Sequence, residues 1–326
     1  MKAIVHTQYG PPDVLQLMDV EKPEPKENQV LVKVQAASVN ALDYRRFEKI
    51  STSGRLMDEV INKATNKVLG ADIAGKVEAV GATVKQLQPG DEVFGVSVGN
   101  MGGFAEFACA AENHLALKPA NLSFETAAAV PVAALTALQA LRNKGMIQSG
   151  QIVLINGASG GVGTFAVQIA KSFGAEVTAV CSTRNLEIAR SIGADHVIDY
   201  TKEDFTHGEQ RYDLIIAVNG YHPLSAYRRA LNSQGIYICI GGALGQIFQA
   251  MLLGPLNSRK KGKKMGFMGI SKTNHNDLVY MAELLEAGKV VPVIDRTYPL
   301  QEVPAAIRYL VEGHARGKVV ITIERN

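Results

Sequence analysis

A glycine-rich segment that follows a short apolar run is the feature that most constrains how this chain folds. Residues Gln151–Asn156 are mainly apolar and β-branched, and they lead directly into Gly157-Ala-Ser-Gly-Gly-Val-Gly163. From Thr164 to Phe173, apolar residues then recur at helical spacing. A strand, a glycine turn and a helix in this order form the first half of a dinucleotide-binding βαβ unit. The sequence therefore predicts a nucleotide site at this turn.

Each glycine has its own physical role in such a turn. Gly157 permits a tight turn, and Gly163 lets helix and strand pack closely. Gly160 and Gly161 let the backbone approach a pyrophosphate, which then meets the positive end of the helix dipole. The predicted cofactor contacts in this turn are Gly157, Ala158, Ser159, Gly160, Gly161, Val162 and Gly163.

The end of the next strand indicates which nucleotide binds. The apolar run Glu176–Cys181 is followed by Ser182-Thr-Arg184, about 20 residues beyond the glycine turn, where an NAD site usually carries Asp or Glu. Ser182, Thr183 and Arg184 suit a 2′-phosphate, because arginine donates charge-assisted hydrogen bonds to phosphate oxygens. The segment can also cap the following helix, with Asn185 or Thr183 as N-cap, and both roles can coexist. We therefore expect NADPH rather than NADH.

Two kinds of pattern divide the chain into domains. Residues 1–122 alternate short β-like runs with turns rich in Pro and Gly, which is typical of a β-rich domain. Beyond the glycine turn, strands and helices alternate, which predicts an α/β fold with a doubly wound parallel sheet. The final β-branched run, Lys318–Ile323, is expected to return to the first domain. The predicted domains are therefore 1–122 with 292–326, and 123–291.

Composition argues against several classes of protein. The net charge is only +3 over 326 residues, so overall charge does not suggest a nucleic-acid partner. Cys109, Cys181 and Cys239 form no CxxC pair, which is typical of buried thiols in a reducing compartment. The N-terminus has no signal-peptide core, and no apolar run approaches the ~20 residues that span a bilayer. We therefore expect a cytoplasmic protein without a membrane span.

A series of short motifs occurs in order along the chain. They are Ser38-Val-Asn-Ala-Leu-Asp43, Gly70-Ala-Asp-Ile-Ala-Gly-Lys-Val-Glu-Ala-Val-Gly81, Pro89-Gly-Asp-Glu-Val93, Gly102-Gly-Phe-Ala-Glu106, Ala128-Ala-Val-Pro131, Asn156–Gly163, Gly193-Ala-Asp195 and Gly317-Lys-Val-Val320. Through them the chain resembles the zinc-free quinone oxidoreductase, or zeta-crystallin-like, branch of the medium-chain dehydrogenase/reductases over essentially its whole length. The resemblance implies a GroES-like β-rich domain, a Rossmann domain and a cofactor cleft between them.

The residue types at the zinc positions of related enzymes argue against a metal. A catalytic zinc in this superfamily needs thiolate, imidazole and carboxylate ligands. Where zinc-dependent relatives carry Cys and Gly-His-Glu, this chain has Ser38 and Gly70-Ala-Asp72. The four closely spaced cysteines of a structural zinc lobe are also absent, since Cys109 is the only cysteine of the first domain. We expect no metal site.

Without a metal, NADPH would supply the hydride and the protein would supply position and electrostatics. A quinone or an α,β-unsaturated carbonyl can accept hydride at carbon because its own carbonyl delocalises the charge. It then needs only hydrogen-bond donors on the enolate oxygen and a proton. An isolated alcohol or ketone is harder to turn over without a Lewis acid. Quinone or enone and alkenal reduction is therefore the predicted activity.

The resemblance also implies individual contacts. Asn40 would lie beside the nicotinamide, and Tyr44 is the nearest phenol that can donate a hydrogen bond to the substrate; these two are the candidate catalytic residues. Asp43 is expected to pin its own loop, through Arg45 or Arg46. The remaining implied cofactor contacts are Thr136 near the carboxamide, Tyr200 near the adenosine phosphate, Gly241 and Gly242 beside the ribose, Phe267, Met268 and Gly269 through their backbone, and Arg316 and Lys318 from the returning tail.

Two further interpretations remain open at this point. The basic run Arg259–Lys264 suits a solvated loop, a nucleic-acid or anionic-membrane contact, or a cleft mouth that attracts anions. A rival reading of the whole chain is an NADPH-binding structural or RNA-binding protein of the zeta-crystallin type with little turnover. The resemblance implies a homodimer through the edge strands of the Rossmann sheet, where Ile236–Leu244 and its neighbours are predicted to form an apolar edge.

Overall fold

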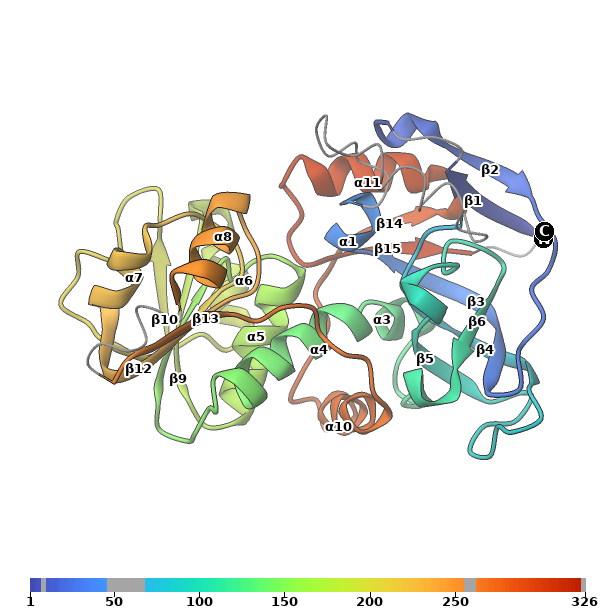
Figure 1. Cartoon of the computed structure of the whole chain (residues 1–326), viewed down its shortest axis with the longest axis horizontal. Helices are drawn as coiled ribbons and strands as arrows, with labels where there is room; N and C mark the ends of the chain where they lie inside the picture. Colours follow the sequence, from blue (N-terminus) through green and yellow to red (C-terminus); the bar gives the residue numbers. More distant parts are fainter. Residues whose placement is uncertain (7–9, 46–67, 255–261, 324–326) are drawn as a thin grey trace. The chain divides into compact units, whose positions relative to one another are not determined.

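The chain divides into two compact units, and each contains a large β-sheet of its own (Figure 1). The computed structural model describes residues 1–6, 10–45, 68–254 and 262–323. Unit 1 comprises Met1–Val132, Thr273–Glu286 and Ile294–Asn326, and unit 2 comprises Ala133–Lys272 and Ala287–Val293. These bounds differ from the predicted division after residues 122 and 291. The reason is that the short helix α3 (Phe124–Ala128) packs on β3 and β4, and α10 (His275–Glu286) packs on β7, all of them in unit 1.

Unit 1 is built on a mainly antiparallel sheet with the strand order β14-β15-β3-β4-β5-β7, in which β6 also pairs with β3. A separate hairpin is formed by β1 and β2. The strands are β1 (Lys2–His6), β2 (Leu15–Asp19), β3 (Gln29–Val39), β4 (Asp72–Val80), β5 (Glu92–Val96), β6 (Phe107–Ala111), β7 (Leu115–Leu117), β14 (Ile294–Pro299) and β15 (Lys318–Thr322). Short β-like runs separated by Gly and Pro turns predicted this β-rich unit correctly.

The tail of the chain returns to the sheet of unit 1, as predicted. β15 pairs antiparallel with β3, with Val320 opposite Ser38. Before it, β14 pairs parallel with β15, and helix α11 (Val303–Val311) connects the two strands. The parallel pair and its helix were not predicted, and they place β15 inside the sheet rather than at its edge.

Unit 2 contains a six-stranded sheet with the order β10-β9-β8-β11-β12-β13, in which every pair is parallel. The strands are β8 (Ile152–Asn156), β9 (Glu176–Cys181), β10 (His196–Asp199), β11 (Tyr212–Ala217), β12 (Leu231–Cys239) and β13 (Lys264–Phe267). The chain order reverses between β8 and β11. In such sheets ligands bind at the carboxyl ends of the strands, at this reversal. The predicted doubly wound sheet is confirmed.

Helices pack against the sheet of unit 2 (Figure 1). They are α5 (Gly161–Ser172), α6 (Leu186–Ser191), α7 (Leu224–Ala230) and α8 (Leu244–Leu252). A further helix, α4 (Pro131–Gln139), continues as a π-helical turn over Ala140–Lys144, which contacts α5. α5 forms because its apolar residues recur at helical spacing and are buried against β8 and β9. Tyr227 of α7 and Ala250 of α8 pack in one apolar cluster with Leu154 and Ile215 of the sheet.

The predicted apolar edge at Ile236–Leu244 is wrong. β12 lies inside the sheet, hydrogen-bonded to β11 on one side and to β13 on the other. The chain then leaves the sheet at the Gly241-Gly242 turn, and α8 begins at Leu244. β13 is the edge strand instead, so any pairing of sheets at this edge involves Lys264–Phe267.

Candidate functional site

The glycine turn after β8 has the geometry that its residues predicted. Gly157 has φ +87°, and the amides of Gly157 and Ala158 both donate to the carbonyl of Val180 at 3.1 Å. A Cβ on Gly163 would lie 2.1 Å from the carbonyl oxygen of Gly157, so only glycine fits there. A Cβ on Gly160 would meet no protein atom closer than 3.9 Å. The protein itself therefore tolerates a side chain at position 160, and the open space beside this residue is available to a ligand.

The start of α5 has no capping side chain. Gly160 is the N-cap residue, with an extended backbone, and it has no side chain to accept from the first amides. These amides, on a 12-residue helix, carry the positive end of the helix dipole. Ser159, Val162 and the turn glycines thus surround a helix start that can bind an anion.

The turn after β9 is tied to the glycine turn by Asn185. Its Nδ2 donates to Ser159 Oγ at 2.9 Å and to Ser182 Oγ at 3.1 Å. Asn185 does occupy the N-cap position of α6, but its side chain makes no capping hydrogen bond. The structure therefore brings Ser159 and Ser182 together through the side chain of Asn185. Sequence analysis considered Asn185 only as a helix cap, so its place in this site was not predicted.

Thr183 is engaged by a buried carboxylate. Its Oγ1 donates to Asp199 Oδ2 at 2.5 Å, while Thr201 donates to Asp199 Oδ1 through both its amide and its hydroxyl. The hydrogen bond from Thr183 is the main cause that lowers the pKa of Asp199 to about 2. A phosphate needs hydrogen-bond donors, and the hydroxyl hydrogen of Thr183 already has Asp199 as its acceptor. Ser182 and the exposed Arg184 are therefore better candidates than Thr183 for a contact with phosphate. Tyr200, directly after β10, is also exposed.

The turn after β11 packs closely against the glycine turn on one side and against the turn after β12 on the other. A Cβ on Gly157 would lie 2.8 Å from the amide nitrogen of Asn219, and one on Gly242 would lie 3.0 Å from the carbonyl oxygen of Gly220. Gly241 likewise approaches the carbonyl of Val218. The predicted glycines at the carboxyl end of the sheet thus have a packing role as well as the implied contact with a ribose.

A buried polar network that sequence reasoning missed supports these turns. Asn156 Nδ2 donates to Tyr227 OH at 2.8 Å, and Gln246 Nε2 donates to Tyr237 OH at 2.6 Å. Gln246 Oε1 also accepts from the amide of His222 at 3.1 Å. Burial raises the pKa of Tyr227 to about 12 and raises that of Tyr237 further, so both phenols stay protonated. The only sequence signal was Gln246 on the mainly apolar helix α8, which also carries Gln249.

In unit 1, a buried cluster of charges lies where β3, β4 and β15 meet. Lys318 Nζ lies 3.2 Å from Asp72 Oδ2, and the two side chains are 3% and 0% exposed. Ser38 Oγ donates to the same carboxylate oxygen at 2.7 Å. The other oxygen, Oδ1, accepts from the amide of Val132 at 2.9 Å. Asp72 thereby links the end of β3, the start of β15 and the start of α4.

Asn40 belongs to this cluster. Its Oδ1 accepts from Lys318 Nζ at 2.6 Å, and its Nδ2 donates to Asp72 Oδ2 at 2.9 Å. The amide is therefore held in one orientation by a cation on one side and an anion on the other. Asp43 pins the same loop by accepting from the amide of Asn40 at 2.7 Å, a partner that was not predicted. Of the expected partners, Arg46 and the side chain of Arg45 lie outside the described part of the chain.

Two other predicted residues of unit 1 have structural partners. Tyr44 is half-buried and packs against the apolar core of the unit. The amide of Arg316 donates to Asp295 Oδ2 at 2.9 Å, and Tyr309 OH donates to the same oxygen at 2.7 Å. This arrangement fixes the loop that leads into Lys318.

The charge cluster does not fit a zinc ion. Ser38 and Asp72 stand at two positions that carry zinc ligands in related enzymes, and they offer only oxygen atoms, a weakly binding hydroxyl and a carboxylate. The Lys318 ammonium already balances the charge of that carboxylate. Over the described ranges, no group of three or more His, Cys, Asp or Glu residues is arranged to hold a metal ion. We therefore derive no chemistry through zinc.

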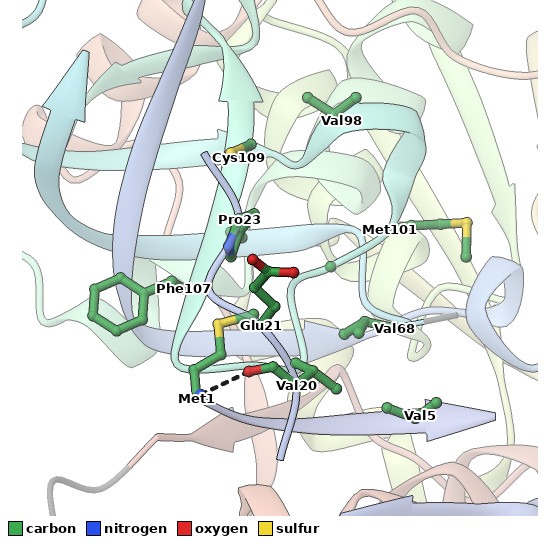
Figure 2. Close-up of a pocket in the computed structure, with 12 residues that line it drawn as sticks. Met1, Val5, Val20, Glu21, Pro23, Val68, Val98, Met101, Phe107 and Cys109 are labelled. Carbon is green, nitrogen blue, oxygen red and sulfur yellow. Dashed lines mark hydrogen bonds between the residues drawn. The ribbon is translucent and has the colours of Figure 1, made fainter. Parts of the chain in front are cut away.

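A cavity of about 430 Å³ lies within unit 1, away from the residues above (Figure 2). Its lining is mainly apolar, and Figure 2 shows Met1, Glu21, Phe107 and Cys109 around it. None of the predicted site residues lines it. Burial raises the pKa of the Cys109 thiol, which makes it a poor nucleophile.

The first half of the basic run Arg259–Lys264, residues 259–261, lies outside the described residues. Lys263, within them, donates from Nζ to the carbonyls of Arg228 and Leu231 at 2.8 Å each, and so supports the end of α7. Across the described part of the chain, no helix combines the length and the apolar character needed to cross a membrane.

Comparison with known families matches both units. Residues 26–120 match the alcohol dehydrogenase GroES-like domain, and residues 192–321 match a family described as zinc-binding dehydrogenase.

Similar proteins span nearly the whole chain. The chain is 37% identical to a 2-methylene-furan-3-one reductase of Solanum lycopersicum and 35% identical to a chloroplastic NADPH-dependent alkenal/one oxidoreductase of Arabidopsis thaliana. Each match covers 98% of this chain and 79% of the relative. Among solved structures, the quinone oxidoreductase from Coxiella burnetii is 32% identical, with a TM-score of 0.86 and 99% of both chains covered.

Proposed function

The chain belongs to the quinone oxidoreductase branch of the medium-chain dehydrogenase/reductase superfamily, and from this premise we propose that it is an NADPH-dependent reductase of quinones or α,β-unsaturated carbonyls. The observation that carries the proposal is the uncapped start of α5 beside the space at Gly160. The pyrophosphate of a dinucleotide would bind there, at a helix start whose N-cap position has space for more than a hydrogen atom. The names of the similar proteins point to the same chemistry, with conjugated carbonyls as acceptors.

The roles of the residues follow from their positions. The amides of Gly160 to Gly163 bind the pyrophosphate, and Arg184 with Ser182 binds the 2′-phosphate. NADPH, when bound, supplies the hydride. Asn40 orients the reacting groups as an amide that Lys318 and Asp72 hold fixed. Tyr44 remains the proposed donor to the substrate oxygen, because a hydrogen bond from its hydroxyl would stabilise the negative charge that develops on the enolate oxygen.

We also propose that turnover needs no metal. The support is the ion pair of Lys318 and Asp72, since a buried ammonium at the carboxylate opposes a second cation there. A conjugated acceptor spreads the incoming charge over its own carbonyl, so a Lewis acid is dispensable for this reaction. The rival reading is an NADPH-binding structural or RNA-binding protein. Among the described residues of the basic run, Lys263 supports α7 and so does not favour it.

The direct test follows the absorbance of NADPH, and separately of NADH, with a quinone, a 2-alkenal and a cyclic enone in excess EDTA. We expect oxidation of NADPH in preference to NADH, at the same rate with and without the chelator. Binding of NADPH without turnover of any acceptor would overturn the proposed activity. Loss of turnover in EDTA that zinc restores would overturn only its metal-free character.

Arg184 is expected to determine the preference for NADPH. Because its guanidinium is exposed at the end of β9, Arg184→Ala should weaken NADPH by roughly tenfold or more, as for loss of a charge-assisted hydrogen bond, and leave NADH nearly unchanged. Dissociation constants for both nucleotides measure this. Arg190→Ala, which removes another exposed arginine of the following helix, is the matched control. Equal weakening of both nucleotides in Arg184→Ala would show that Arg184 does not recognise the 2′-phosphate.

We further propose a homodimer that forms through the β13 edge, and a cytoplasmic location. The dimer is supported by the position of β13 at the end of the strand order among the described residues and by the exposed apolar residues Phe248 and Leu252 of the neighbouring helix α8. A monomeric mass in sedimentation equilibrium would contradict it. The location is supported by Cys181 and Cys239, which are buried free thiols typical of a reducing compartment. Fractionation of cells that express the tagged chain tests it.

A further inference from the structure

The segment Met268–Lys272, which follows the edge strand β13, is anchored at both ends. At its start, the amide of Met268 donates to the carbonyl of Cys239 at 2.8 Å. At its end, Gln139 of α4 forms two hydrogen bonds with the backbone of Lys272. Gln139 Nε2 donates to the Lys272 carbonyl at 2.7 Å, and Gln139 Oε1 accepts from the Lys272 amide at 3.0 Å. This pair of hydrogen bonds, the Gln139 clamp, is buried, since Gln139 is only 8% exposed.

The local structure of α4 places the clamp. Thr136 and Gln139 are three residues apart and therefore lie on one face of the helix. Thr136 Oγ1 lies 3.0 Å from Ser271 Oγ, next to the Gln139 clamp. The α-helix ends at Gln139 and widens into the π-helical turn Ala140–Lys144, a feature often found at functional sites. Two successive residues of the segment, Ser271 and Lys272, are thus held by the same helix face.

Between its anchors the segment is open. Gly269 has φ +80°, and a Cβ built there would meet no atom within 4 Å. Ile270 is 81% exposed, although it is a large apolar residue. Within the described residues, the backbone groups of Gly269 and Ile270 form no hydrogen bond. A fixed segment with free backbone groups and an exposed apolar side chain lies directly after the carboxyl end of a parallel strand, where such sheets bind ligands.

We propose that Gln139 is a positioning residue that holds Met268–Ser271 against the nicotinamide end of NADPH. In this arrangement Gly269 and Ile270 offer backbone groups to the carboxamide, and the Ile270 side chain covers one face of a planar conjugated ring. Gln139 does not contact the cofactor itself; it acts through Lys272. The proposal rests on the proposed function, because it assigns one end of the same dinucleotide to this segment.

A second glutamine provides a matched control. Gln168 of α5 clamps Val291 with the same two bonds, from Nε2 to the carbonyl at 3.0 Å and from the amide to Oε1 at 2.8 Å. It is 6% exposed. Both clamps hold a segment close to the point where the chain passes from unit 2 to unit 1, near Lys272 and Val293. Gln168→Leu therefore reproduces the loss of a buried clamp near a crossing, without changing Met268–Ser271.

The test compares two probes in the full-length protein. NADPH reports on the whole site, and adenosine 2′,5′-bisphosphate reports on the adenosine end alone. In Gln139→Leu we expect NADPH to bind roughly tenfold more weakly, as for loss of a buried hydrogen-bonded pair, while the bisphosphate binds as in the wild type. The rate of hydride transfer in single turnover should also fall, since the nicotinamide is less well oriented. Gln168→Leu should bind both probes as the wild type does.

Three results would overturn the proposal. Unchanged NADPH affinity in Gln139→Leu is one, and parallel weakening of both probes is another. The third is the same selective loss of NADPH affinity in Gln168→Leu. It would mean that the cause is the disturbed passage of the chain between the units and not the position of Met268–Ser271. If Gln139→Leu does not fold, Gln139→Glu decides, because it keeps the acceptor for the Lys272 amide and should show a smaller loss of the same selective kind. A wild-type protein that binds neither probe would instead refute the proposed function.

Discussion

Replacing Gly163 with alanine is expected to abolish NADPH binding and to lower the free energy of unfolding by about 3 kcal/mol. The added Cβ would lie 2.1 Å from the carbonyl oxygen of Gly157 and 2.8 Å from the backbone of Ala158. These are backbone atoms in the turn itself, so no side chain can move aside to make room. The turn must open, and the amides at the start of α5 then lose their common direction. Urea unfolding and NADPH titration measure the two effects.

Gly160→Ala is the control that separates folding from binding. Its Cβ would meet no protein atom closer than 3.9 Å, so the unfolding free energy should stay within about 1 kcal/mol of the wild type. NADPH should still bind at least tenfold more weakly, because the methyl group occupies the space in which the backbone meets the pyrophosphate. A Gly163→Ala protein as stable as the wild type would contradict the steric argument. A Gly160→Ala protein with unchanged affinity would contradict the position of the pyrophosphate.

Lys318→Met is expected to lower the free energy of unfolding by about 3–5 kcal/mol. The substitution leaves the Asp72 carboxylate, which is 0% exposed, without its cation. It also removes the donor that holds Asn40 Oδ1, so the amide loses one of its two fixed partners. The ratio kcat/KM should fall together with stability, whereas binding of adenosine 2′,5′-bisphosphate to unit 2 should not change. Denaturant unfolding and steady-state kinetics measure these effects.

Two further variants test whether the uncompensated charge is the cause. Asp72→Asn combined with Lys318→Met removes both charges and should recover part of the lost stability, because the amide needs no cation. Lys2→Met breaks the ion pair between Lys2 and Asp19, whose side chains are 45% and 73% exposed, respectively. This variant should change the free energy of unfolding by less than about 1 kcal/mol. If the double variant is less stable than Lys318→Met alone, buried charge is not the source of the loss.

The parts of the fold that sequence predicted correctly depend on local constraints. Gly163 must be glycine because of Gly157 and Ala158, which are only a few residues away, so the turn has a signature in a short window of sequence. The alternation of strands and helices after it likewise follows from local periodicity. The resemblance to known oxidoreductases then supplied the identity of the two units, which local patterns alone do not.

The parts that sequence missed depend on partners far along the chain. Lys318 and Asp72 are 246 residues apart, and nothing around either residue indicates the other. Asn185 has the sequence of an N-cap, yet its amide binds Ser159, which is 26 residues earlier. α11 begins with Pro304 in its first turn, a residue that is favourable there but also marks loops, so the helix was not recognised. β12 is apolar, as is expected of an edge strand that pairs two subunits. Only the position of β13 beside it shows that β12 is internal.

The place of β15 in its sheet has a consequence for the order in which the chain acquires structure during synthesis. This strand, Lys318–Thr322, lies between β14 and β3 and so completes a sheet that began with residues near the N-terminus. Since β15 follows every other strand of this sheet in the sequence, the side of β3 that pairs with it, and the Asp72 carboxylate that Lys318 balances, lack their partners until β15 has been synthesised. The strands of unit 2, in contrast, lie between residues 152 and 267 and can pair while translation continues. We therefore expect nascent unit 1 to expose one unpaired side of β3 for longer than the strands of unit 2 stay unpaired.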